Sequence, residues 1–190
     1  MTMCADMNLP NKLTILRMVL AVVFLFFLFA HGAIYKILAF LTFLIAALSD
    51  FFDGYIAKKY NMISDFGRLM DPIADKVLVI AAFLAFVEMD IVPAWMVVII
   101  IFREFVVTGM RLLALQKREV IEATMGGKHK TVSQMASIFI ILLFIIFREF
   151  GRPFPEGIIL VLMAITVILT IISGTSFFLR NRGIIWPNER

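Results

Sequence analysis

Residues 50 to 76 read DFFDGYIAKKYNMISDFGRLMDPIADK, a stretch whose aspartates recur at helical spacing. Asp50 and Asp53 lie three residues apart. Asp71 and Asp75 lie four apart, so each pair falls on one face of a helix. Four carboxylates gathered without matching cations would repel one another and be costly to desolvate. Hard divalent cations remove that conflict, and two such ions support displacement at phosphorus. The stretch therefore predicts two helix ends that together carry a metal site.

The composition places this stretch in a membrane protein. Of the 190 residues, 62% are hydrophobic, and the mean hydropathy is +0.99, which is far more apolar material than a soluble domain of this size can bury. The net charge of +4 and the pI near 9.4 are explained by membrane topology. We therefore expect no nucleic-acid partner.

Six apolar segments are each near the roughly 20 residues that cross a bilayer. They predict an all-α integral membrane protein, a single domain over 1–190 with six transmembrane helices. The second segment is expected to continue as helix to about Tyr60, the third to start near Gly67, and the fourth to extend to Leu115. Residues 1–12 are predicted to form an interfacial amphipathic segment, in which Pro10 suits a helix start. The segments lie at 13–30, 34–48, 73–87, 92–102, 132–147 and 157–179.

Lysine and arginine set the expected orientation. With both termini inside, all but three of the 18 lysines and arginines fall on one side of the predicted spans. The other side has only Lys36, Arg148 and Arg152. Because cytoplasmic loops carry the excess of such residues, the aspartate stretch is predicted to face the cytoplasm.

The aspartate stretch fits the pattern D-x2-D-G-x2-A-K-x8-G-x3-D-x3-D. This pattern resembles the signature of the CDP-alcohol phosphotransferase family, integral membrane enzymes that make phospholipid head groups. Lys58 departs from the signature, which usually has arginine there, and lysine lacks arginine's planar fork. The resemblance implies two Mg²⁺ or Mn²⁺ ions per active site, with Asp50 and Asp71 shared between them, Asp53 completing one shell and Asp75 the other. It also implies that Asp75 is the general base, and that the protein is a homodimer.

The same resemblance implies residues for the CDP-lipid. Gly54, Ala57 and Gly67 lack bulk and would let the nucleotide approach the helix backbone; close helix packing is the alternative reading. Lys58 would place a cation near the nucleotide or its diphosphate. The implied nucleotide-binding set is Asn11, Thr14, Asp50, Gly54, Ala57, Lys58, Ser64, Gly67 and Asp71.

A second group of cations points to the acceptor. Arg103 and Arg111 are eight residues apart and hence roughly on one helical face, and Glu104 is expected to hold Arg103 in place. Placing a charged side chain in or near a membrane costs free energy unless the charge binds a partner. A group of arginines and lysines suits the binding of a phosphate. The alternative is a basic loop that meets anionic lipid head groups. The predicted acceptor-phosphate residues are Arg103, Arg111, Lys128, Lys130 and Arg68.

The run REFVVTGMR at 103–111 also resembles the phosphatidylglycerophosphate synthase branch of that family. This resemblance covers nearly the whole chain. It implies a bacterial inner or plasma membrane enzyme that transfers a phosphatidyl group from CDP-diacylglycerol to sn-glycerol 3-phosphate and releases CMP. A sister enzyme using inositol phosphate or serine is the alternative within the family. A metal-dependent membrane prenyltransferase and a cation transporter are alternatives of other classes, and the compact signature beside a polar turn disfavours both.

Overall fold

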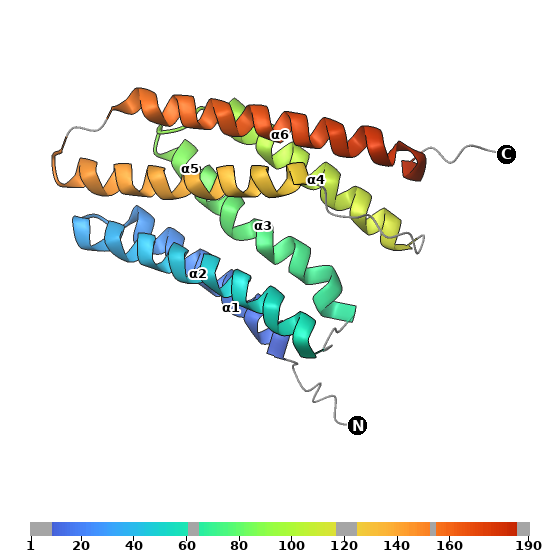
Figure 1. The fold of residues 1–190 in the computed structure, drawn as a ribbon. Helices are drawn as coiled ribbons and strands as arrows, with labels where there is room; N and C mark the ends of the chain where they lie inside the picture. The colour runs from blue at the N-terminus through green and yellow to red at the C-terminus, as the bar shows by residue number, and fades with distance from the viewer. Residues whose placement is uncertain (1–8, 61–64, 117–124, 153–154, 186–190) are drawn as a thin grey trace. The chain divides into compact units, whose positions relative to one another are not determined.

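The structure, a computed structural model, describes residues 9–60, 65–116, 125–152 and 155–185. It describes side chains for 15–49, 76–114, 130–152, 155 and 157–181. The described residues form six α-helices and contain no strand, as expected for this composition (Figure 1). The helices are α1 (Leu9–Phe29), α2 (Ala33–Tyr60), α3 (Asp65–Glu88), α4 (Ala94–Gln116), α5 (Met125–Glu149) and α6 (Glu156–Ile185).

The helix extensions expected from the sequence are confirmed. α2 continues past the apolar segment to Tyr60, α3 begins at Asp65, and α4 reaches Gln116. Residues 9–12 of the predicted interfacial segment belong to α1 itself, and Pro10 lies in its first turn, where a missing N–H costs nothing. Residues 1–8 lie outside the described residues.

The chain divides into two compact units. The first comprises Met1–Ala85 and Leu142–Arg152, and in it α1 packs along α2 (Figure 1). Phe24 and Phe43 are fully buried between these two helices, with their ring centroids 5.5 Å apart. The turn between them uses Gly32 at φ +111°, a conformation that favours glycine. After this turn, Lys36 Nζ donates hydrogen bonds to the carbonyls of Leu28 at 2.6 Å and Ala30 at 2.8 Å, which closes the end of α1.

The second unit comprises Phe86–Ile141 and Pro153–Arg190, and in it α4 packs against α6. Val107 and Met110 of α4 form a buried cluster with Phe177 of α6. The first part of α5 joins α6 through hydroxyl groups, because Thr166 Oγ1 lies 2.7 Å from Ser133 Oγ and 2.8 Å from Ser137 Oγ. Apolar packing and a buried polar contact thus fix α6 against two different helices.

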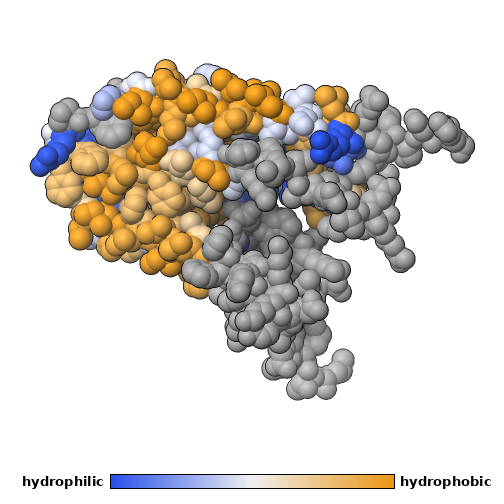
Figure 2. Space-filling view, viewed as in Figure 1, coloured by the Kyte–Doolittle hydropathy of each residue, from blue (hydrophilic) through white to orange (hydrophobic). Residues whose placement is uncertain are grey.

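The described helices are consistent with a membrane protein. Two of them are long and apolar enough to cross a bilayer, at Lys130–Glu149 and Gly157–Asn181, and two shorter apolar stretches lie at Ile15–Phe29 and Ala33–Ser49. Much of the described surface in Figure 2 is hydrophobic. α6, like other helices of the chain, exposes a row of large apolar side chains. Contact of these side chains with lipid would avoid the free-energy cost of exposing them to water. On α6 they are Ile158, Leu160, Val161, Ile165, Ile168, Ile171, Ile172 and Leu179.

Candidate functional site

The aspartate stretch is divided between two helices of the first unit. Asp50 and Asp53 lie within about the last three turns of α2, and Asp71 and Asp75 lie within about the first three turns of α3. Each pair therefore shares one helical face, as the spacing predicts. Only positions 61–64 separate the two helices, so the chain brings both pairs to the same end of the unit.

The other signature positions follow the same division. Gly54, Ala57 and Lys58 lie on α2, and Gly67 and Arg68 lie on α3. The side chains of these residues and of the four aspartates lie outside the described part of the structure, as does the whole of Ser64. Their predicted roles stay predictions.

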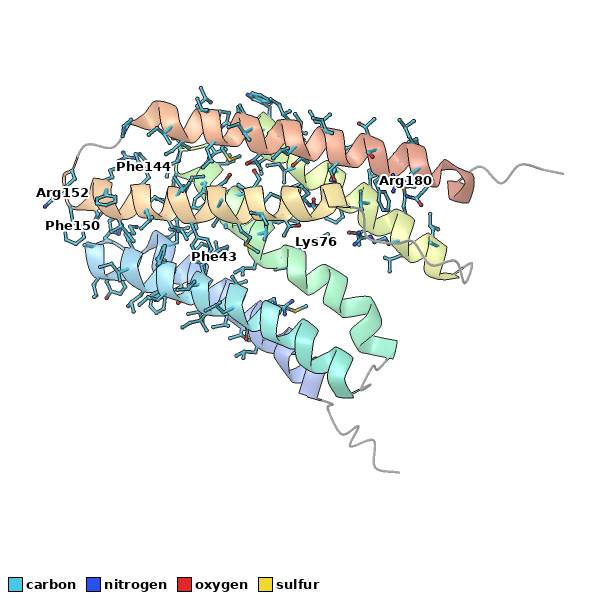
Figure 3. The ribbon with its side chains drawn as sticks, in the orientation of Figure 1. Phe43, Lys76, Phe144, Phe150, Arg152 and Arg180 are labelled. Atoms are coloured by element: carbon cyan, nitrogen blue, oxygen red, sulfur yellow. The ribbon has the colours of Figure 1, made fainter. Side chains whose placement is uncertain are left out.

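Two further residues of the predicted nucleotide site, Asn11 and Thr14, lie on α1, and their side chains are likewise outside the described part. On the same helix, Arg17 is buried at 6% exposure and is not without an interaction partner. Lys76 directly follows Asp75 and is the first residue of α3 whose side chain is described; Figure 3 labels it on that helix. A buried guanidinium in an apolar helix is costly unless it is used, so Arg17 is a further candidate for this site that the sequence motifs do not include.

The predicted acceptor residues are better described, because most of them lie in the second unit. Arg103 and Glu104 are on α4, and Lys130 is on α5. One carboxylate oxygen, Glu104 Oε1, accepts hydrogen bonds from both cations: Arg103 Nη1 lies 3.2 Å away, and Lys130 Nζ forms a second, closer ion pair. Glu104 and Lys130 are buried, at 6% and 4% exposure. The expectation that Glu104 holds Arg103 is confirmed, and Lys130 is held with it.

This shared carboxylate gives the site its electrostatic character. Two cations share one carboxylate in a largely buried setting, where an unpaired charge would be strongly unfavourable. Arg103 Nη2 donates a further hydrogen bond to Ser173 Oγ of α6 at 2.8 Å. Arg103 Nε is buried and has no hydrogen-bond partner in the described structure. The guanidinium therefore keeps donor capacity for an anion while its direction is fixed from two sides.

Arg111 lies on the same side of α4 as Arg103, as the eight-residue spacing predicts, because both contact α6. Its guanidinium carbon lies 5.7 Å from the centroid of the Phe177 ring, a cation–π arrangement, and the residue is exposed. Arg111 thus stays accessible, whereas Arg103 and Lys130 are largely withdrawn from solvent. Lys128 lies in the first turn of α5, and its side chain is outside the described part.

The sequence reading missed the contribution of α6. Thr166, Thr170 and Ser173 recur at steps of four and three along an otherwise apolar helix, which places them on one face. All three are buried, Thr166 facing two serines of α5 and Ser173 facing Arg103. Small polar residues at helical spacing inside an apolar segment were the signal that could have found this face.

Comparison with known proteins identifies the family. A family model described as CDP-alcohol phosphatidyltransferase matches residues 7–172. The chain belongs to this family. The match includes both aspartate pairs and the cation group of α4 and α5.

Relatives of this chain within the CDP-alcohol phosphatidyltransferase family carry consistent names. A CDP-diacylglycerol–glycerol-3-phosphate 3-phosphatidyltransferase of Bacillus subtilis is 36% identical over 187 residues, covering 92% of this chain and 95% of the relative. A protein of the same name from Rickettsia prowazekii is 37% identical over 174 residues, covering 91% of this chain and 94% of the relative. A probable phosphatidylglycerophosphate synthase of Mycobacterium tuberculosis is 38% identical over 176 residues, covering 91% of this chain and 81% of the relative. The resemblance read from the sequence is thereby confirmed.

Proposed function

We propose that this protein transfers the phosphatidyl group of CDP-diacylglycerol to sn-glycerol 3-phosphate, giving phosphatidylglycerol phosphate and CMP. The observation that carries the proposal is the near full-length similarity to relatives named for this reaction. The cations of the second unit support the choice of acceptor, because Arg103 and Lys130 are two neighbouring, largely buried cations of a kind that suits a phosphate. A neutral acceptor such as serine would not need such a group.

In the proposed reaction an acceptor hydroxyl attacks the β phosphorus of CDP-diacylglycerol. A new phosphorus–oxygen bond forms, the bond from this phosphorus to the oxygen that bridges to the CMP phosphate breaks, and CMP leaves with that electron pair. Asp75 takes the proton of the hydroxyl as the general base. Arg103, Lys130 and Arg111 hold the acceptor's phosphate, with Lys128 and Arg68 as further contributors.

The donor set of the aspartate stretch fits two divalent cations. Four carboxylates on the ends of α2 and α3 provide only oxygen ligands, which suit Mg²⁺ or Mn²⁺. Asp50, Asp53, Asp71 and Asp75 would hold the ions, which when bound would neutralise charge on the diphosphate. Gly54, Ala57 and Gly67 would leave room for the nucleotide, while Asn11, Thr14, Lys58 and Ser64 would complete its site.

We further propose that the six helices are six spans of one domain in a bacterial inner or plasma membrane, with the aspartate stretch at the cytoplasmic face. Two described helices already meet the length and hydropathy of a span. We also propose that the protein works as a homodimer.

The test is CMP release by the purified protein in lipid or detergent with CDP-diacylglycerol and one acceptor at a time. We expect release with sn-glycerol 3-phosphate to exceed release with serine by about 100-fold or more, because serine has no phosphate and would leave the cations of the site unpaired. Release with inositol phosphate should also be slower, although its phosphate can pair with the same cations. Removal of divalent cations by a chelator should abolish release, and added Mg²⁺ should restore it. A faster reaction with serine or inositol phosphate would assign the protein to the sister enzymes. Full activity in the chelator would contradict the metal site.

A further inference from the structure

The side chain of Arg103 crosses α6 directly over Gly174. A Cβ atom added at Gly174 would lie 2.8 Å from Arg103 Cγ, 3.6 Å from its Nε and 3.9 Å from its Cδ. The three atoms are consecutive along the side chain, so Arg103 lies across position 174 from its Cγ to its Nε. The first of them is closer than real Cβ contacts allow, and Cγ lies near the root of the side chain. Any residue larger than glycine at 174 would therefore force Arg103 to move.

The end of the same side chain is fixed by the neighbouring residue. Arg103 Nη2 donates to Ser173 Oγ at 2.8 Å, and Nη1 donates to Glu104 Oε1 at 3.2 Å. The guanidinium is thus fixed at two of its nitrogens, and its aliphatic part rests on a position without a side chain. Nε remains buried without a partner in the described structure, so one donor is left over by this arrangement.

We propose that Ser173 and Gly174 form a notch on α6 that positions Arg103 for the phosphate of the acceptor. This inference rests on the proposed function and assigns its acceptor site two positioning residues on a helix outside both sequence motifs. Glycine weakens a helix relative to alanine, so its place in the middle of α6 calls for a packing reason. Close helix contact is the usual one, but the three nearest atoms that a Cβ at 174 would meet all belong to Arg103.

The decisive variants are Gly174→Ala and Ser173→Ala, with Gly157→Ala as the matched control. Gly157 lies on the same helix, and a Cβ there would meet nothing within 4 Å. We expect each notch variant to raise the KM for sn-glycerol 3-phosphate about tenfold, since a displaced guanidinium loses a charge-assisted hydrogen bond. The KM for CDP-diacylglycerol should stay within twofold of wild type, and Gly157→Ala should change neither constant.

A second set of measurements separates positioning from general packing. In an Arg103→Ala background, Gly174→Ala should have no further effect on the KM for sn-glycerol 3-phosphate, because the side chain that the notch positions is gone. An equal rise in both backgrounds would overturn the proposal. So would an unchanged KM in Gly174→Ala when Arg103→Ala alone raises it.

The proposed function can fail separately from the notch. If wild-type protein releases no CMP with sn-glycerol 3-phosphate, the proposed function is wrong. If wild type is active and Arg103→Ala leaves the KM for this acceptor unchanged, Arg103 lies outside the acceptor site and the notch has no role in binding. Thermal unfolding of each variant in detergent confirms that the kinetic constants come from folded protein.

Discussion

At the scale of single residues, Glu104 shows how one acidic group serves two cations. Its carboxylate satisfies Arg103 and Lys130 at once, and all three side chains are largely withdrawn from solvent. Without this anion the two cations would face each other in a medium that screens charge poorly. The same group therefore contributes to folding and keeps both cations in place.

We expect Glu104→Gln to lower the free energy of unfolding by about 3 kcal/mol, the cost of breaking a buried ion pair by neutralising one partner. Glu88→Gln is the matched control, because Glu88 is exposed at the end of α3 and its substitution should change stability by less than about 0.5 kcal/mol. Thermal or denaturant-induced unfolding in detergent micelles measures both. Equal stability of the two variants would mean that the shared carboxylate is not needed for folding.

Asp75 is proposed both as a metal ligand and as the general base, so binding of the CDP-lipid and release of CMP are measured separately. Asp75→Asn keeps the size of the side chain but removes its capacity to accept the proton of the acceptor hydroxyl. CMP release should fall by at least about 100-fold, the usual contribution of a general base. Binding of CDP-diacylglycerol, followed by its ability to protect the protein against thermal unfolding, should persist. Substantial CMP release by this variant would exclude Asp75 as the base.

At the scale of helices, the contact between α5 and α6 includes buried hydroxyl groups. Thr166 lies within hydrogen-bond distance of Ser133 and Ser137 and is fully buried. Lipid is as apolar as leucine, so apolar side chains alone give helices in a membrane little reason to associate. The hydroxyl contact therefore fixes the rotation of α6, and with it the place of Ser173 and Gly174.

Thr166→Val should lower the free energy of unfolding by about 1 kcal/mol, because it keeps the shape of the side chain and removes two hydroxyl contacts. Thr175→Val is the control on the same helix, since Thr175 is exposed. Unfolding midpoints of the two variants in the same detergent give the comparison. If both midpoints equal that of wild type, α6 is held by its packing against α4 alone.

At the scale of the whole molecule, the uneven distribution of lysine and arginine predicts the orientation of the chain in the membrane. Arg148 and Arg152 are both exposed at the turn after α5, where Figure 3 labels Arg152, whereas Arg118 lies in the connection after α4. The positive-inside rule assigns these two connections to opposite sides of the membrane.

Single cysteines can test this assignment in cells that express the protein. In a Cys4→Ser background, Arg152→Cys should react with a membrane-impermeant maleimide in intact cells. Arg118→Cys should react only after the membrane is permeabilised, because it should face the cytoplasm. The reverse pattern would place the aspartate stretch on the outer face and contradict the proposed access of the nucleotide.

The sequence predicted the helices well because each feature that decides them is local. The spacing of Asp50 and Asp53 requires α2 to continue beyond its apolar part, and it does so to Tyr60. The pairing of Glu104 with Lys130 depends on how α4 and α5 are rotated against each other, which no local pattern specifies. Gly174 gave no signal either, because a lone glycine in an apolar helix becomes informative only when the residue lying across it is known.

The bond that Lys36 makes with the end of α1 has a practical consequence for surface chemistry. Its ammonium is occupied by two backbone carbonyls, and the residue is only 8% exposed, although it follows directly after a turn. An amine-reactive reagent added to intact cells should therefore leave this lysine unmodified. If mass spectrometry finds Lys36 unlabelled, the result agrees with an ammonium group that stays bound to the carbonyls at the end of α1. It does not contradict a location of Lys36 on the outer side of the membrane.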